Sequence, residues 1–274
     1  MSCWLRAVEL IRSRLDNMVL AILQARYSSS RLPGKILKDI VGRPMVFLEM
    51  ERLKRAKNID KLVLATSVEQ SDNPVEEACR KYGVECYRGN LDDVLDRYYS
   101  CAEAYKPEHV VRVTGDCPLI DPAVVDMVIK KHLAEGNDYT CNINPPTFPD
   151  GLDVEIMKYS VLREAWQEAK LPSEREHVTP FIRNHPERYK LASMENDKDL
   201  SALRWTVDEP ADFDFVCLIY EKLYKIKFDF SMNDVLHLLK KEPALLQINS
   251  GFERNEGMKK SLLADKEFLA KEEK

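Results

Sequence analysis

Positive charges and small hydroxyl side chains are concentrated in one short stretch of the chain, residues 24–35. This stretch contains Arg26, Arg31 and Lys35 together with three consecutive serines, and it has no acidic residue. A nucleoside triphosphate requires several converging cations, and small residues let backbone N–H groups approach its phosphates. The stretch has neither a Walker sequence nor a Gly-x-Gly-x-x-Gly motif. On composition alone it fits a solvated basic loop as well as it fits a phosphate-binding loop.

Two aspartates follow apolar stretches that are typical of β-strands. Asp116 comes directly after Gly115, a residue that permits close approach of the backbone. A carboxylate in such a place can bind a metal ion or a hydroxyl group. For Asp208 the sequence alone favours the N-cap of the following helix, the role that we also expect for Asp121 before Pro122. Asp116 is therefore the functional candidate, and Asp208 has two open interpretations.

Strand and helix patterns alternate along the chain from residue 18 onward. Strands are predicted over residues 19–23, 61–65, 84–87, 110–113, 139–142, 154–157 and 203–207. Helices are predicted over residues 44–53, 73–82, 91–105, 121–133, 160–167 and 174–183, and from 211 onward. The alternation predicts an α/β fold, a three-layer αβα sandwich with a mostly parallel sheet. Such sheets bind ligands at the carboxyl ends of their strands, where the basic stretch and both aspartates fall.

Composition and charge narrow the class of protein and of partner. The 274 residues are 45% hydrophobic and 32% charged, as in a globular protein with a sizeable core. A net charge of −5 argues against nucleic acid as a partner. No apolar run approaches the roughly 20 residues that span a bilayer, so we expect no membrane association. Seven cysteines without a Cys-x-x-Cys pair indicate reduced thiols and a cytoplasmic location.

The pattern divides the chain into three parts. Residues 1–17 form an N-terminal extension, in which the helical spacing of Trp4, Val8, Ile11 and Leu15 predicts a short amphipathic helix. Residues 18–250 carry the alternating pattern and form the main domain. Residues 251–274 form a charged tail that we expect to be helical or frayed.

Five motifs in order along the chain resemble one family of enzymes. The motif LQARYSSSRLPGKILKDIVGRPM resembles the signature of the acylneuraminate and 3-deoxy-manno-octulosonate cytidylyltransferase superfamily. The motifs VVRVTGDCPLIDP, FPDGLDVEIM, REHVTPFI and RWTVDEPADFDFV are similar to its spore coat polysaccharide biosynthesis branch. Together they extend over residues 18–239, most of the chain.

This resemblance implies a fold, a reaction and partners. The fold would be the GT-A-like nucleotide-diphospho-sugar transferase fold. The reaction would transfer CMP from CTP to a sugar or sugar acid with release of pyrophosphate, in surface polysaccharide biosynthesis. Members are commonly homodimers, which implies a homodimer built partly through residues 148–157. The residues themselves do not exclude UTP in place of CTP.

The resemblance also assigns roles to residues of this chain. It implies that CTP is bound by Ala25 beside the base, by Thr114, and by Arg26, Arg31 and Lys35 at the triphosphate. The catalytic residues would be Arg31, Lys35, Asp116 and Asp208, and the two aspartates would carry Mg²⁺. Four residues would face the acceptor, namely Asp153, Glu155, Arg175 and His177. The His-x-Gly-x-Tyr type acceptor motif of the octulosonate enzymes is missing from the sequence.

Two other functions fit parts of the pattern. A GT-A glycosyltransferase that consumes a sugar nucleotide would have an Asp-x-Asp metal motif after a strand. The chain contains Asp212, Phe213 and Asp214, but in a helical pattern that predicts a surface position. A non-catalytic nucleotide-binding module would keep the basic loop but would have no use for two strand-end carboxylates.

Overall fold

The computed structural model describes residues 17–29, 31–252, 254 and 256–272. The N-terminal extension, in which we expect a helix, lies outside this part of the chain except for its last residue, Asn17. Among the described residues, no helix combines the length and the apolar character needed to cross a bilayer.

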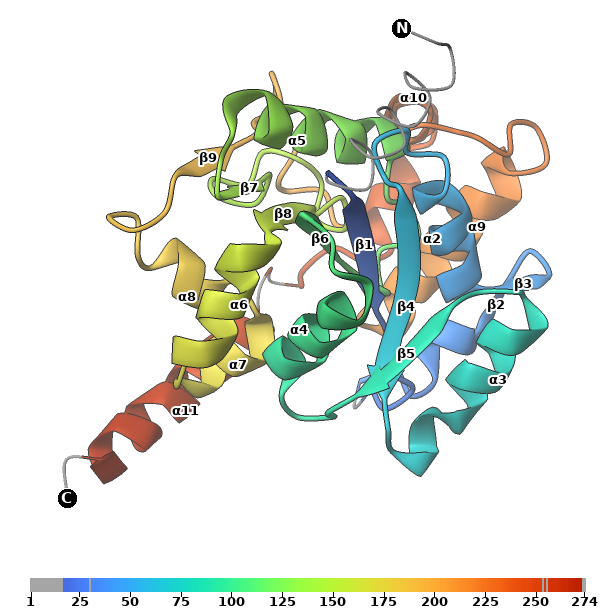
Figure 1. Cartoon of the computed structure of the whole chain (residues 1–274). Helices are drawn as coiled ribbons and strands as arrows, with labels where there is room; N and C mark the ends of the chain where they lie inside the picture. The colour runs from blue at the N-terminus through green and yellow to red at the C-terminus, as the bar shows by residue number, and fades with distance from the viewer. Residues whose placement is uncertain (1–16, 30, 253, 255, 273–274) are drawn as a thin grey trace, which may run out of the picture.

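A seven-stranded sheet runs through the molecule in the order β5-β4-β1-β6-β8-β7-β9 (Figure 1). Its strands are β1 (Val19–Gln24), β4 (Lys61–Ser67), β5 (Cys86–Gly89), β6 (His109–Thr114), β7 (Tyr139–Cys141), β8 (Glu155–Lys158) and β9 (Leu191–Ser193). Only β8 runs against its neighbours, since the other pairs are parallel. The sheet is therefore mostly parallel, as predicted. A separate short hairpin joins β2 (Asp39–Ile40) and β3 (Arg43–Pro44).

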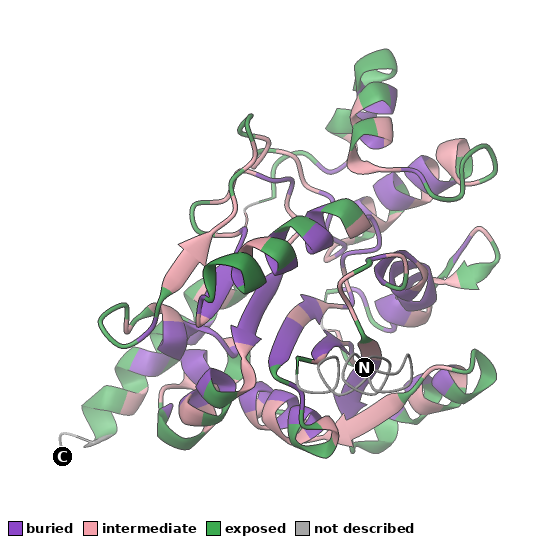
Figure 2. Ribbon diagram, turned by 45° about the horizontal axis from the view of Figure 1, so that its top comes forward, coloured by how far each residue is buried: buried purple, intermediate pink, exposed green. Residues whose placement is uncertain are grey.

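Strand β1 shows why both faces of the sheet are covered. Val19, Ala21 and Leu23 belong to one apolar core, and Leu20 and Ile22 belong to another, because successive strand residues point to opposite faces. The first core also includes α2 (Met45–Leu53), α3 (Asn73–Lys81), α5 (Pro122–Glu135), α9 (Pro210–Leu223) and α10 (Met232–Lys241). The second includes α4 (Val94–Tyr105), α6 (Tyr159–Glu168) and α8 (Pro180–Arg183). Most central strands are buried and the outer helix faces are exposed (Figure 2), which confirms the three-layer sandwich.

The helix predicted over residues 174–183 is two helices. The first is α7 (Pro172–His177), and α8 begins at Pro180. Between them Val178 has a positive φ of 73°, which is not helical, and Pro180 has no N–H with which to continue a helix. The break turns the chain at the point where His177 and Thr179 enter the cavity described below.

The prediction of a strand over residues 203–207 is wrong, and the sequence did not predict β9. Arg204 makes only an isolated bridge to Asp150. The N–H of Trp205 donates to the carbonyl of Asp150, and the N–H of Val207 donates to that of Asp116. The segment therefore divides its backbone hydrogen bonds between two loops, so an apolar pattern typical of a strand forms no ladder.

Candidate active site

The basic loop and the Gly-Asp loop leave the sheet side by side. Gln24, at the end of β1, lies opposite Thr114, at the end of β6, and the N–H of Gly115 donates to the carbonyl of Gln24 at 2.7 Å. A Cβ atom on Gly115 would lie 2.7 Å from the Cβ of Ala25. Only glycine fits this approach, so the residue types at 25 and 115 bring the two loops together.

A buried carboxylate fixes the start of the basic loop. Asp72 is fully buried and accepts hydrogen bonds from the N–H of Tyr27 at 2.7 Å and from the N–H of Ser67 at 3.0 Å. The N–H of Ala25 donates to the carbonyl of Ala65. The loop is thereby attached to the carboxyl end of β4, with Arg26 on the cavity side.

Lys35 occupies the point where the loops converge. Its ammonium lies 3.2 Å from Asp116 Oδ2, 3.0 Å from Asp208 Oδ1 and 2.7 Å from the carbonyl of Val207. Burial would lower the pKa of Lys35, but the two carboxylates outweigh it and raise the pKa. Burial would raise the pKa of Asp116, but Lys35 and the Thr114 hydroxyl together hold it below its ordinary value. Lys35 and Asp116 are therefore charged together at neutral pH.

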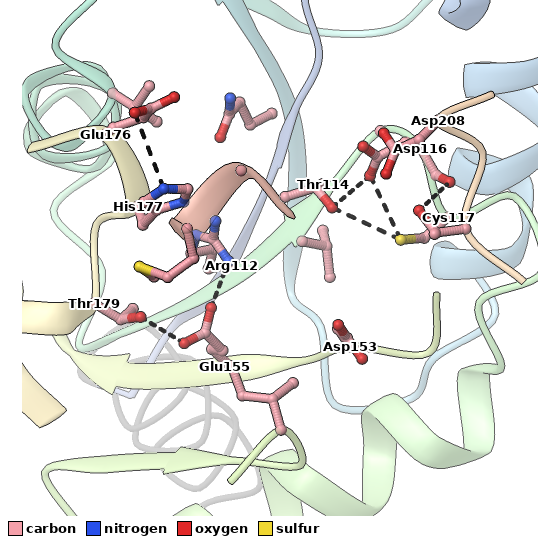
Figure 3. Close-up of a pocket in the computed structure, with 18 of the residues that line it drawn as sticks. Arg112, Thr114, Asp116, Cys117, Asp153, Glu155, Glu176, His177, Thr179 and Asp208 are labelled. Carbon is pink, nitrogen blue, oxygen red and sulfur yellow. Dashed lines mark hydrogen bonds and ion pairs between the residues drawn. The ribbon is translucent and has the colours of Figure 1, made fainter. Parts of the chain in front are cut away.

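Asp208 is not the N-cap of α9, which corrects the capping interpretation. The cap is Glu209, and Asp212 accepts hydrogen bonds from the N–H groups of Asp208 and Glu209 at 3.0 and 2.9 Å. The Asp208 carboxylate points instead toward Asp116 (Figure 3). Asp121 does cap its helix, accepting from the N–H of Ala123 at 2.8 Å.

Three cations surround the Asp208 carboxylate. Besides Lys35, Arg31 lies 3.0 Å from its Oδ1 and Arg204 lies 3.5 Å from its Oδ2. Arg204 also holds Asp212 through two hydrogen bonds of 2.8 and 2.9 Å. Asp212 is thus buried in the helix start, which confirms its helical place and corrects its predicted surface position.

The aspartate pair has the chemistry of a site for a hard divalent cation. In the described part of the chain, no three His, Cys, Asp or Glu residues gather to hold a metal. Mg²⁺ needs only one or two carboxylates, because waters and substrate phosphates complete its coordination. Asp116 and Asp208 both contact one ammonium, so they are close enough to share a cation, and the pair fits this requirement.

A second acidic loop, which carries Asp150 and Asp153, lines the same cavity as the aspartate pair. Gly151 has φ of 105°, and a Cβ atom there would lie 2.5 Å from the backbone nitrogen of Thr206. This close contact seats Asp150 and Asp153 beside the 204–208 segment. Burial, opposed by Arg254 and assisted by Asp150, raises the pKa of Asp153 to about 7.

Glu155 holds the far end of the cavity together rather than pointing freely into it. The carboxylate is fully buried and accepts hydrogen bonds from Arg112, from the Tyr139 hydroxyl and, at 2.7 Å, from the Thr179 hydroxyl. Figure 3 shows Arg112 and Thr179 converging on it. Burial would raise the pKa of Glu155, but Arg112 and Arg183 outweigh it and lower the pKa.

Glu155→Gln should lower the free energy of unfolding by about 3–5 kcal/mol, because it leaves the largely buried Arg112 side chain, 17% exposed, without its counter-charge. The lowered pKa also sets a pH dependence. The wild-type carboxylate contributes stability above about pH 4.5, and loses it as the pH falls through the lower folded-state pKa. Urea unfolding at pH 7 and pH 4 measures both effects, with the exposed Glu77→Gln as control. Equal unfolding free energies for Glu155→Gln and wild type at pH 7 would contradict this role.

The structure separates the two remaining residues expected to face the acceptor. His177 lines the cavity, and its Nε2 lies 2.9 Å from the Ser261 hydroxyl. Arg175 lies outside it, because its guanidinium pairs with Asp93 at the start of α4 and donates to the carbonyl of Trp166. Arg175 instead lines a smaller neighbouring hollow that Arg26 also reaches.

One cavity of about 860 Å³ joins these groups. It is lined by all the residues proposed from the sequence except Arg175, namely Ala25, Arg26, Arg31, Lys35, Thr114, Asp116, Asp153, Glu155, His177 and Asp208. It is also lined by cations that sequence reasoning missed, namely Arg112, Arg183, Arg204, Arg254 and Lys260. A charged residue inside an apolar strand was an available signal for Arg112, whereas Arg254 lies in a segment with no strand or motif.

Comparisons with known proteins agree with this geometry. The sequence profile of a family described as cytidylyltransferase matches residues 20–240. The spore coat polysaccharide biosynthesis protein SpsF of Bacillus subtilis is 34% identical over 234 residues, 83% of this chain and 96% of that protein. The 3-deoxy-manno-octulosonate cytidylyltransferase of Geobacter sulfurreducens is 39% identical over 113 residues, 40% of this chain and 44% of that protein.

A solved structure extends the similarity to the fold. The structure of a cytidylyltransferase from Leptospira borgpetersenii has a TM-score of 0.81 at 32% identity, covering 87% of this chain and all of that one. The resemblance and the GT-A-like fold that the motifs imply are thereby confirmed.

Proposed function

Because the chain belongs to the cytidylyltransferase family, we propose that it transfers CMP from CTP to a sugar or sugar acid that enters a surface polysaccharide. The observation that carries this proposal is the meeting of the basic loop with the aspartate pair in one cavity. SpsF of Bacillus subtilis bears a name from spore coat polysaccharide biosynthesis, which supports a sugar-type acceptor.

In the proposed reaction an acceptor hydroxyl oxygen bonds to the α-phosphorus of CTP. The bond from that phosphorus to the bridging oxygen breaks, pyrophosphate leaves, and the hydroxyl proton is released. Transfer of this kind depends mainly on positioning and on neutralising charge. Arg26, Arg31 and Lys35 would hold the triphosphate and stabilise the departing pyrophosphate, where negative charge grows. Ala25 and Thr114 would lie along the nucleotide.

We assign Mg²⁺ to Asp116 and Asp208. When bound, Mg²⁺ would supply positive charge at the phosphates and favour loss of the acceptor proton. Without the ion, the same two carboxylates hold the Lys35 ammonium in place. Lys35 and the ion would therefore share the neutralisation of the aspartate pair.

The acceptor would lie on the side of Asp153 and His177, with Glu155 holding the wall behind them. Arg175 can act only indirectly on that side, because Asp93 engages it. A glycosyltransferase is the weaker alternative, since Asp212 of its Asp-x-Asp sequence is engaged by Arg204 and by two backbone N–H groups. A protein that only binds a nucleotide would not need the two aspartates, Asp116 and Asp208, that contact Lys35.

We also propose a cytoplasmic location and a homodimer. The six cysteines among the described residues are all free thiols, which supports a cytoplasmic site where CTP is present. The resemblance implies a homodimer through residues 148–157, but β8 within that range is an interior strand and its apolar side chains are buried. Residues 148–151 are also buried, apart from the half-buried Asp150, so a second copy would have to contact mainly another surface.

Pyrophosphate release tests the nucleotide half of the proposal. With Mg²⁺ and a panel of sugars and sugar acids, we expect release from CTP to exceed release from UTP, ATP and GTP by at least tenfold. Equal release from CTP and UTP would contradict the cytidine assignment, and release from none would contradict the function.

A further inference from the structure

The chain continues into the cavity beyond the part that matches the family. The family match ends at residue 240, and α11 (Glu256–Glu272) then lies against α7 and extends past it (Figure 1). Residues of this segment nevertheless line the same cavity as Asp116, namely Arg254, Gly257, Met258, Lys260, Leu262 and Asp265. We refer to Arg254 and residues 256–265 as the C-terminal wall.

Specific polar contacts attach the C-terminal wall to α7. Asp265 accepts hydrogen bonds from the N–H of Ser173 at 2.8 Å and from its hydroxyl at 2.6 Å. Both residues are buried, with 7% and 3% of their surface exposed. Hydrogen bonds to a buried carboxylate are among the stronger ones, so α11 has a defined position on α7.

A second contact joins the wall to the cavity histidine. The Ser261 hydroxyl donates to Glu176 Oε2 at 2.5 Å, and its oxygen lies 2.9 Å from Nε2 of His177. A hydroxyl has one proton to donate. Because the Ser261 hydroxyl donates its proton to Glu176, the Nε2–H of His177 is the donor in the hydrogen bond to Ser261. The wall thus fixes the orientation of a side chain that faces the cavity.

Arg254 connects the wall to the acidic loop. Its guanidinium lies 2.6 Å from Asp153 Oδ1 and 3.6 Å from Asp150 Oδ1, and it reaches the carbonyl of Phe148 at 3.4 Å. Arg254 is the cation that pairs with Asp153, whereas the neighbouring carboxylates Asp150 and Glu155 pair with Arg204 and Arg112. Arg254 lowers the pKa of Asp153 against the effect of burial.

We propose that the C-terminal wall completes the acceptor subsite, and that Arg254 is a positioning residue that holds Asp153 for hydrogen bonding to acceptor hydroxyls. This inference rests on the proposed function. Asp153 offers carboxylate oxygens, which accept hydrogen bonds from sugar hydroxyls. Lys35, Arg31 and Asp116 belong to the nucleotide side, so the wall should set affinity for the acceptor and not for CTP.

Steady-state kinetics of Arg254→Ala test the proposal, with the acceptor that supports the fastest pyrophosphate release. We expect the acceptor KM to rise about tenfold or more, because a hydrogen bond to a charged group is among the stronger ones and its loss weakens binding accordingly. The KM for CTP should stay within twofold. Arg254→Lys should recover part of the loss, and Arg80→Ala, on the exposed face of α3, should match wild type. An unchanged acceptor KM, or an equal rise in both KM values, would overturn the proposal.

Hydrogen exchange separates this inference from the proposed function. If wild type releases no pyrophosphate from CTP, the function is wrong, but the attachment of the wall is still measurable. We expect the amides of α11 to be protected in wild type and to lose protection in Asp265→Ala, while β1 and β6 keep theirs. Unprotected α11 amides in wild type would mean that no wall forms, and the inference would fail on its own.

Discussion

Lys35→Ala should slow pyrophosphate release by roughly a hundredfold or more, since one preorganised electrostatic donor contributes on the order of 3 kcal/mol. Lys35 is the most buried cation of the basic loop, 8% exposed, and its ammonium touches both Asp116 and Asp208. The substitution also removes the charge that the two carboxylates share. We therefore expect some loss of stability, smaller than the about 3–5 kcal/mol of a fully buried pair, because both carboxylates are partly exposed.

A matched control distinguishes the effect of losing the Lys35 charge from the effect of losing any positive charge in this part of the chain. Lys38 lies three residues further along and is exposed, so Lys38→Ala should release pyrophosphate at the wild-type rate. Assays at a temperature where circular dichroism shows Lys35→Ala to be folded exclude unfolding as the cause. A weaker affinity for CTP with unchanged turnover would restrict Lys35 to ground-state binding.

The aspartate pair should give a loss of similar size with a distinct signature. Asp116→Asn and Asp208→Asn keep the side-chain size but remove a negative ligand, and each should lower the rate roughly a hundredfold or more. The Mg²⁺ concentration for half-maximal rate should rise in both. The double variant should lose less than the two single losses combined, because both report on one bound ion.

Two results would contradict the metal assignment. One is a reduced rate with unchanged Mg²⁺ dependence, which would mean that the carboxylates act only by holding Lys35. The other is a near-normal rate in both single variants. Asp214→Asn, on the exposed face of α9, is the control and should leave the rate and the Mg²⁺ dependence unchanged.

The placement of the basic loop and of Asp116 could be predicted because these residues lie next to the strands that position them. The basic loop directly follows β1, and Asp116 directly follows β6, so a local apolar pattern places both at the carboxyl edge. Asp208 could not be placed in this way. Its position depends on the hydrogen bond from the N–H of Val207 to the carbonyl of Asp116. The helix cap is Glu209, one residue further along, and sequence patterns do not fix a helix boundary to one residue.

The placement of the residues that we assign to the acceptor was harder to predict, because it depends on contacts between segments far apart in the sequence. Glu155 and Arg112 lie on two different strands, and only the antiparallel pairing of β6 with β8 brings them together. Arg254 contacts Asp153 across 101 residues of sequence, and the contact exists only because α11 is attached to α7. The break between α7 and α8, by contrast, had a visible signal in Pro180, since a proline inside a helical pattern ends or bends the helix.

The most direct test of the account follows the α-phosphate of CTP. Wild-type protein is incubated with CTP labelled at that phosphate, with Mg²⁺ and with the panel of sugars and sugar acids. The products are then separated and identified by mass spectrometry. We expect one pyrophosphate for each CTP consumed, with the label recovered as CMP bonded to one acceptor. Consumption of a sugar nucleotide instead of CTP, or binding of CTP without any covalent product, would contradict it.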